Sequence, residues 1–136
     1  MKIIACLCTK GGLLFNNRRQ SRDRVLMQNL SEYVADGAIF INDFSSSLFL
    51  NTDMSAIEVS SPLDAAGEND YVFVENLTLS GYESKINEMV IYRWNRDYPA
   101  DFRLDIKPLD IGLSLVESSE FKGSSHDRIT REIYRK

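Results

Sequence analysis

The stretch from Tyr71 to Asp105, YVFVENLTLSGYESKINEMVIYRWNRDYPADFRLD, decides the fold. It holds two apolar runs, Tyr71–Val74 and Met89–Tyr92, which are rich in β-branched and aromatic residues and are typical of strands covered on both faces. A short helical connection between the runs predicts a βαβ unit. Glu75-Asn76 follows the first run, and Arg93 to Arg96 follows the second. Because ligands bind at the carboxyl ends of parallel strands in open α/β sheets, the stretch also predicts where a site would lie.

The composition indicates one soluble domain. With 136 residues, 43% of them hydrophobic and 26% charged, the chain can bury one core, and we expect a single domain over residues 1–136. A net charge of −4 argues against a nucleic acid partner. No apolar run approaches the roughly 20 residues of a membrane span, and the start is too soon interrupted for a signal peptide. We therefore expect a cytoplasmic protein without membrane contact.

The residues before this stretch predict two further strands with a helix between them. Lys2 to Cys8 is typical of a buried strand, and Ala38–Ile41 of the next one. Ser21 is the expected cap of the helix, with Asp23 in its first turn, and Gly37 is expected to end it. The buried stripe of this helix is predicted from helical spacing and consists of Leu26, Leu30, Tyr33 and Val34.

The C-terminal part of the chain predicts a strand and leaves one element open. Leu113–Phe121 is typical of a strand. Arg128–Tyr134 alternates as the second strand of a hairpin does. A short helix capped by Ser125 also fits these residues, because Ile129 and Ile133 are four positions apart.

The order of these elements and several local strings resemble the dihydrofolate reductase family. The resemblance implies an α/β fold with a mixed, mainly parallel sheet that is flanked by helices and ends in a C-terminal antiparallel hairpin. It spans most of the chain and rests on the order and spacing of the strings together. The strings are the first strand with Gly11-Gly12, Phe15-Asn16-Asn17-Arg18, Val72-Phe73-Val74, Met89-Val90-Ile91-Tyr92, Tyr98-Pro99-Ala100-Asp101, Ser118-Ser119-Glu120-Phe121 and Glu132-Ile133-Tyr134-Arg135.

The motifs that give this family its activity are replaced in the chain. The family's strand that matches Tyr71–Val74 ends in two glycines, whose bare backbone lies against the NADPH diphosphate. Here these positions are Glu75 and Asn76, and a glutamate opposes phosphate binding both sterically and electrostatically. The family has an Asp-Thr string. In this chain Phe102 stands at the position of its threonine. We therefore expect no NADPH cofactor and no ordinary reductase activity.

The chain is also similar to short bacterial proteins that sometimes bear the label ribonuclease Z. That activity requires a two-zinc site built from several His and Asp ligands. His126 is the only histidine here, and Cys6 and Cys8 are two positions apart on a strand without further ligands near them. We expect no metal site, with both cysteines acting as small buried hydrophobes.

Nine polar residues near the expected strand ends are candidates for ligand binding. The arginine-rich segment before the first helix could hold a phosphate or carboxylate, because guanidinium groups and helix N-termini both favour anions. A solvated loop and an Asn helix cap are the alternatives. Trp94 is expected to pack in the protein rather than to stack on a ligand. Ser124-Ser125-His126 is expected to form a turn rather than a nucleophile and its base. The candidates are Arg18, Arg19, Asp23, Arg24, Glu75, Asn76, Arg93, Asn95 and Arg96.

Two functional hypotheses follow. In the first, the protein binds a small anionic ligand, phosphorylated or nucleotide-like, in the cleft at the strand carboxyl ends, with or without a reaction. In the second, it is a protein-interaction or self-association module, such as a homodimer, that uses the arginines and Trp94 and has a vestigial cleft. The first predicts that one of Arg18, Arg19, Arg22 and Arg24 lies within roughly 4 Å of the Glu75 carboxylate, because an unpaired charge is costly in a partly dry cleft.

Overall fold

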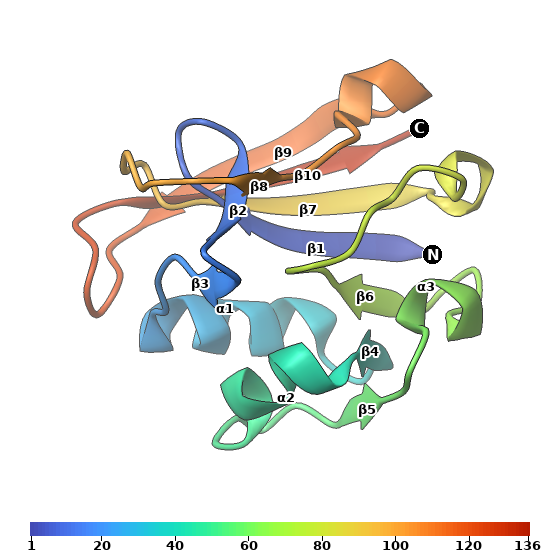
Figure 1. The fold of residues 1–136 in the computed structure, drawn as a ribbon, viewed down its shortest axis with the longest axis horizontal. Coiled ribbons are helices and arrows are strands. Elements are labelled where there is room, and N and C mark those ends of the chain that lie inside the picture. Colours follow the sequence, from blue (N-terminus) through green and yellow to red (C-terminus); the bar gives the residue numbers. More distant parts are fainter.

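A seven-stranded mixed sheet forms the centre of the structure, a computed structural model that describes all residues 1–136 (Figure 1). Its strands lie in the order β5-β4-β6-β1-β7-β10-β9. The first five strands in this order are parallel, and β10 and β9 are antiparallel to their neighbours. The strands are β1 (Lys2–Leu7), β4 (Ile39–Ile41), β5 (Ala56–Glu58), β6 (Tyr71–Phe73), β7 (Glu88–Arg93), β9 (Ser114–Phe121) and β10 (Ile129–Arg135).

This arrangement confirms the predicted fold class and settles the open element. Arg128–Tyr134 is a strand, because β10 pairs with both β7 and β9. The connection from β6 to β7 differs from the prediction, since it carries only one 3₁₀ turn, η1 (Glu83–Lys85), instead of an α-helix. In addition, β1 lies between β6 and β7, with Ile4 opposite both Phe73 and Val90. The N-terminal strand is therefore the central one.

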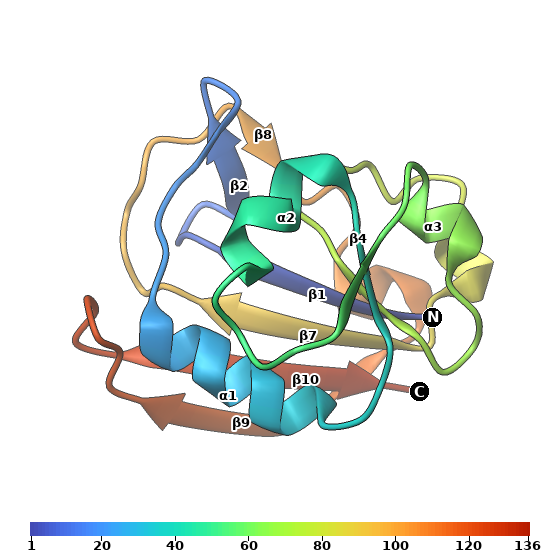
Figure 2. The same ribbon diagram turned by 90° about the horizontal axis from the view of Figure 1, so that it is seen from below.

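A second, smaller sheet and three helices pack on the main sheet. The small sheet has the order β3-β2-β8, with β2 at Gly12–Phe15, β3 at Arg18–Arg19 and β8 at Phe102–Arg103. Figure 2 shows α1 lying along one face, over β10 and β9. The helices are α1 (Arg24–Val34), α2 (Asp43–Phe49) and α3 (Pro62–Ala65), and a second 3₁₀ turn, η2, covers Pro108–Ile111.

Alternating side chains of the strands form two cores, one on each face of the sheet. Ile3 and Ile91 belong to the core under the small sheet and the long loops. Ile4 and Val90 belong to the core that α1 covers with Leu26 and Leu30, among others. The continuous apolar runs of the sequence reflect burial on both faces.

Helix α1 begins later than the sequence predicted. Asp23 is its N-cap, and its carboxylate accepts hydrogen bonds from the backbone N–H groups of Val25 and Leu26 at 2.9 and 3.1 Å. Ser21 was the expected cap, but its hydroxyl lies 3.1 Å from His126 Nε2 instead. Gly37 does not end the helix directly, because Ala35 already has a φ of 51° and breaks the helical backbone.

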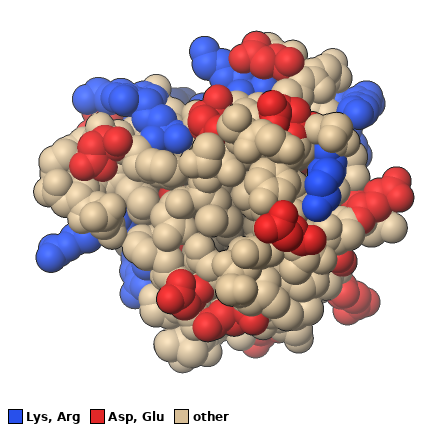
Figure 3. Space-filling view, turned by 45° about the vertical axis from the view of Figure 1, so that its right-hand side comes forward, with Lys and Arg blue, Asp and Glu red and all other residues tan.

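The charges on the face that Figure 3 draws are mixed. In the view of Figure 3, basic and acidic side chains are scattered around the edge of a face whose middle carries few charges, and they do not gather in a patch of one sign. No helix of the structure is both long enough and apolar enough to cross a membrane.

Candidate functional site

Glu75, two residues beyond β6, is the centre of a buried ionic cluster. Its side chain is 7% exposed. Arg19, at the end of β3, donates to it through both Nε, 2.5 Å from Oε2, and Nη2, 2.7 Å from Oε1. The Ser45 hydroxyl of α2 donates to Oε1 at 2.8 Å. This fork confirms the predicted ion pair between Glu75 and one of the four arginines, and it neutralises the carboxylate.

Beside this cluster, Asn42 caps the N-terminus of α2 and is hydrogen-bonded to Asn76. The Asn42 amide donates to the Asn76 side-chain oxygen at 2.8 Å, while the Asn42 oxygen accepts from the backbone N–H of Ser45 at 3.2 Å. The Arg19 guanidinium also lies over the Phe44 ring, 5.6 Å from its centroid. The side chains of Glu75 and Asn76 are thus both hydrogen-bonded to other residues of the protein.

An open hollow of about 660 Å³ lies next to the Arg19–Glu75 pair. Arg18 and Arg22 line it and take part in none of the six ion pairs of the structure. We call this cavity the arginine hollow. The residues around it are Asn17, Arg18, Arg19, Ser21, Arg22, Phe44, Ser47 and Ser125.

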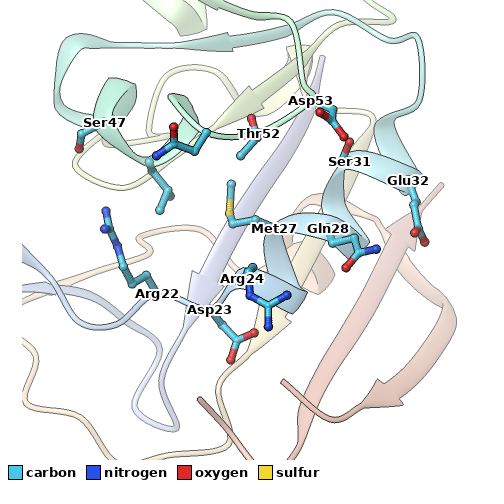
Figure 4. A pocket seen from close by; sticks show the side chains of 12 residues that line it. Arg22, Asp23, Arg24, Met27, Gln28, Ser31, Glu32, Ser47, Thr52 and Asp53 are labelled. Atoms are coloured by element: carbon cyan, nitrogen blue, oxygen red, sulfur yellow. The ribbon is translucent and has the colours of Figure 1, made fainter. Parts of the chain in front are cut away.

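A second cavity of about 440 Å³ continues from the arginine hollow between α1 and the end of α2. Arg22 and Arg24 lie at one end of it, and Glu32 and Asp53 lie at the other (Figure 4). Arg24 is exposed and forms no ion pair, so it extends the cationic region toward α1.

Three of the predicted site residues lie at the end of β7 or just beyond it, outside the Arg19–Glu75 cluster. Arg93 forms an ion pair of 2.8 Å with Glu132 of the neighbouring β10. Asn95, just beyond β7, has a φ of 57°, and its amide donates to the Arg128 carbonyl and the Thr130 hydroxyl. Arg96 is exposed and has no ion pair.

Asp23 was predicted to contact a ligand, but the protein itself occupies its carboxylate. The side chain is fully buried. It accepts five hydrogen bonds: those from Val25 and Leu26, two from the backbone N–H groups of Ser124 and Ser125, and one from His126 Nδ1 at 2.9 Å. Burial alone would raise the pKa of Asp23, but the hydrogen bonds from His126 and the backbone amides outweigh it and hold the pKa well below its ordinary value.

His126 is the main residue that the sequence prediction missed. Its ring stacks on Trp94 with centroids 4.5 Å apart, and its Nε2 lies 3.1 Å from Ser21 Oγ and 2.9 Å from the Tyr98 hydroxyl. Because the Asp23 carboxylate is ionised and can only accept, Nδ1 carries a proton, and the Ser21 and Tyr98 hydroxyls lie where they can donate to Nε2. Trp94 is 4% exposed, which confirms the prediction that it packs.

No local signal in the sequence could have revealed this cluster. Ser21 and His126 are 105 positions apart, and the loop between β9 and β10 brings them together by folding onto the N-cap of α1. The chain bends at Ser124-Ser125, where a turn was expected, and the backbone N–H groups of both residues donate to Asp23. No group of three or more His, Cys, Asp or Glu side chains is placed to hold a metal ion.

Comparison with solved structures supports the fold. The chain is similar to dihydrofolate reductase from Enterococcus faecalis, solved in complex with NADP(H) and RAB-propyl, with a TM-score of 0.69 over 98% of this chain and 94% of that one. The sequence identity is 7%, so the likeness shows a dihydrofolate reductase-like fold and nothing finer. No family model matches the chain, and no curated protein does. The ribonuclease Z label receives no support.

Proposed function

We propose that this chain is a diverged dihydrofolate reductase-like protein that binds a small anionic ligand, bearing a phosphate or a carboxylate, in the arginine hollow. The observation that carries the proposal is the contrast between adjacent arginines. Arg19 is neutralised by Glu75, whereas Arg18 and Arg22 line the same cavity without an acidic partner. The Arg19–Glu75 pair fixes one wall and adds no net charge, so the cavity keeps the positive charge of the two unpaired guanidinium groups.

The hydroxyl groups in the hollow suit the same ligand. Ser47 and Ser125 line the cavity and are exposed, so their hydroxyls can donate to the oxygens of a phosphate or carboxylate. A planar guanidinium group adds two parallel donors for such an anion. Phe44 lies under Arg19 and gives the cavity one apolar side.

The residues after β6 support the proposal that the ligand is not NADPH. Glu75 and Asn76 stand where the related family has two glycines, and both side chains are held by other residues. A diphosphate approaching this backbone would have to displace a buried ion pair. Breaking such a pair costs about 3–5 kcal/mol, so we expect no saturable NADPH binding in a fluorescence titration.

The alternative, an interaction surface built on arginines and Trp94, loses its aromatic residue. Trp94 is buried against His126 and cannot reach a partner. Homodimer formation and a cytoplasmic location remain predictions.

Titration with inorganic pyrophosphate and with adipate, followed by backbone NMR, tests the proposed function. Saturable shifts should gather around residues 17–22, Ser47 and Ser125. The double variant Arg18→Gln/Arg22→Gln should weaken binding at least about tenfold, because charge-assisted hydrogen bonds contribute about 1.5–3 kcal/mol each. Lys107→Gln/Lys136→Gln is the matched control, since it removes the same charge from exposed residues outside the hollow. Equal weakening in both double variants, or no saturation with either anion, would contradict the proposal.

A further inference from the structure

We infer that Ser21 is the nucleophile of an ester-hydrolysing site, with His126 as its base and Asp23 as the residue that positions His126. The chemical class of the substrate, an ester whose acyl chain ends in a carboxylate, rests on the proposed anion site. The nucleophile and base do not rest on it. They follow from the hydrogen-bonded series Asp23, His126, Ser21 and from the position of Ser21 on the wall of the arginine hollow.

The geometry of this series is that of an activated hydroxyl. Asp23 Oδ2 lies 2.9 Å from His126 Nδ1, and His126 Nε2 lies 3.1 Å from Ser21 Oγ. Both distances are within the range required of a nucleophile and its base. The Asp23 carboxylate fixes the tautomer that leaves the Nε2 lone pair directed at the hydroxyls, as the aspartate of a serine protease triad does.

The positions of the three side chains match the roles. Asp23 and His126 are buried, and Trp94 stacks on the imidazole and limits its rotation. Ser21 is half-buried and lines the cavity, so only the nucleophile of the three lies on its wall. A base held this rigidly needs no reorganisation before it accepts a proton.

Groups that could stabilise an oxyanion surround Ser21. The segment from Gln20 to Asp23 connects β3 to α1 without regular secondary structure, and the backbone N–H groups of Ser21 and Arg22 donate to no acceptor in the protein. The Arg22 guanidinium is also unpaired. These donors can bind the negative charge that develops on a carbonyl oxygen attacked by Ser21.

The reaction balances with water as the only co-reactant. Ser21 Oγ forms a bond to the ester carbonyl carbon as its proton passes to His126 Nε2. The bond to the leaving oxygen then breaks, and His126 returns the proton to that oxygen, which leaves as an alcohol. Water attacks the acyl-Ser21 ester while His126 takes its proton. The bond to Ser21 breaks, the proton returns to Oγ, and a carboxylic acid is released.

The anion site defines which esters fit. Ser21 lines the same cavity as Arg18 and Arg22, so a carboxylate at the far end of an acyl chain can pair with a guanidinium while its ester group reaches Ser21. Compared with a neutral chain of equal length, the anionic chain should gain about tenfold in kcat/KM, as expected for one charge-assisted hydrogen bond.

Tyr98 offers a readout that a purely structural histidine would not give. The titratable groups in contact with His126 are Asp23 and Tyr98, and the Tyr98 hydroxyl shares Nε2 with Ser21. A hydroxyl that donates to the neutral ring favours the unprotonated form. Tyr98→Phe should therefore move the acidic limb of the pH–rate profile to higher pH.

The experiment combines covalent labelling with ester hydrolysis by the full chain. A fluorophosphonate should label Ser21, with loss of fluoride and a phosphonyl adduct that peptide mass spectrometry locates. Hydrolysis of mono-4-nitrophenyl adipate should exceed that of 4-nitrophenyl hexanoate. Ser21→Ala and His126→Gln should each lower the rate at least about a thousandfold. Ser118→Ala, an exposed serine on β9, is the control and should leave labelling and rate unchanged.

The possible outcomes separate the two proposals. Labelling absent from Ser21, or a Ser21→Ala rate equal to that of the unaltered chain, overturns the nucleophile assignment even where pyrophosphate binds. Labelling of Ser21 with equal rates for adipate and hexanoate esters supports the nucleophile and contradicts the anionic substrate. If His126→Gln fails to fold, the Tyr98→Phe profile decides: an unmoved acidic limb contradicts the role of His126 as base.

Discussion

Two buried glutamates at opposite ends of the sheet have nearly the same partners. Glu75 follows β6 at the carboxyl ends of the parallel strands, and Glu88 opens β7 at their amino ends. Glu75 is paired with Arg19 and accepts from the Ser45 hydroxyl. Glu88 is paired with Arg135 at 2.6 Å and accepts from the Tyr33 hydroxyl at 3.0 Å.

What differs is the chemistry around each pair. Around Glu88, Arg135 also donates to the Tyr33 hydroxyl, so Glu88, Arg135 and Tyr33 hydrogen-bond one another at the C-terminal end of β10. Around Glu75, Arg18 and Arg22 are left without acidic partners beside an open cavity. A buried ion pair alone therefore does not mark a site. The proposed anion site rests instead on the unpaired charge next to the Arg19–Glu75 pair, because no ion pair of the fold uses it.

The largest effect should come from breaking the two ion pairs. Arg19→Met leaves Glu75 buried and without its guanidinium, and we expect the free energy of unfolding to fall by about 3–5 kcal/mol. Arg135→Met should cost only about 1–2 kcal/mol, because the Arg135 side chain is 52% exposed and Glu88 keeps the Tyr33 hydroxyl. Urea denaturation of both variants at neutral pH measures the difference.

A double variant provides the control for this comparison. In Arg19→Met/Glu75→Gln no buried charge is left unpaired, so much of the stability lost in Arg19→Met should return. Equal losses of stability for Arg19→Met and Arg135→Met would contradict the expected difference between the Glu75–Arg19 and Glu88–Arg135 pairs.

The free energy of unfolding should also depend on pH, and in opposite directions at the two ends of the parallel strands. Acid should destabilise the carboxyl end, and alkali the amino end. At the carboxyl end the pKa of Asp23 is lowered in the folded state from its ordinary 3.8, so the stability it contributes is present above that pH and is lost as pH falls toward the folded-state pKa. We expect a loss of about 1 kcal/mol by pH 3. His126→Gln should reduce this acid sensitivity, because the hydrogen bond from His126 is a main cause of the lowered pKa.

At the amino end the sensitivity should lie in alkali. Burial and the Glu88 carboxylate raise the pKa of Tyr33 to about 12, although a hydrogen bond from Arg135 opposes this. The stability is complete below the ordinary pKa of 10 and is lost as pH rises toward 12. Tyr33→Phe should therefore flatten the alkaline limb by about 0.5–1 kcal/mol, after allowance for solvent screening. Melting temperatures across the pH range that leave the alkaline limb unchanged in Tyr33→Phe would place the titrating group elsewhere.

The fold class was predictable from the sequence in two steps: local patterns predicted most of the strands, and the resemblance to the dihydrofolate reductase family implied how they are arranged in the sheet. The runs at Tyr71–Val74 and Met89–Tyr92 show burial on both faces, and they form β6 and β7. The Arg19–Glu75 pair was predicted on the expectation that both segments follow core strands whose carboxyl ends lie at one edge. The pair is present, although only Glu75 follows such a strand and Arg19 lies on β3 of the small sheet. The Ser21–His126 contact was not predicted, because it depends on how one loop packs on the cap of α1, and no periodicity encodes that packing.

The charges of Arg18 and Arg22 should matter little for stability and much for anion binding. Arg18 and Arg22 form no ion pair, so the fold gains nothing from their charges. Arg18→Gln/Arg22→Gln should change the free energy of unfolding by less than about 0.5 kcal/mol, as surface substitutions away from specific contacts do. The same variant is expected to lose anion binding, so stability and binding would separate at the carboxyl end of the sheet. A loss of more than about 1 kcal/mol in urea denaturation would mean that these arginines support the scaffold, as Arg135 does at the other end, and the arginine hollow would then be a surface feature of the fold instead of a site.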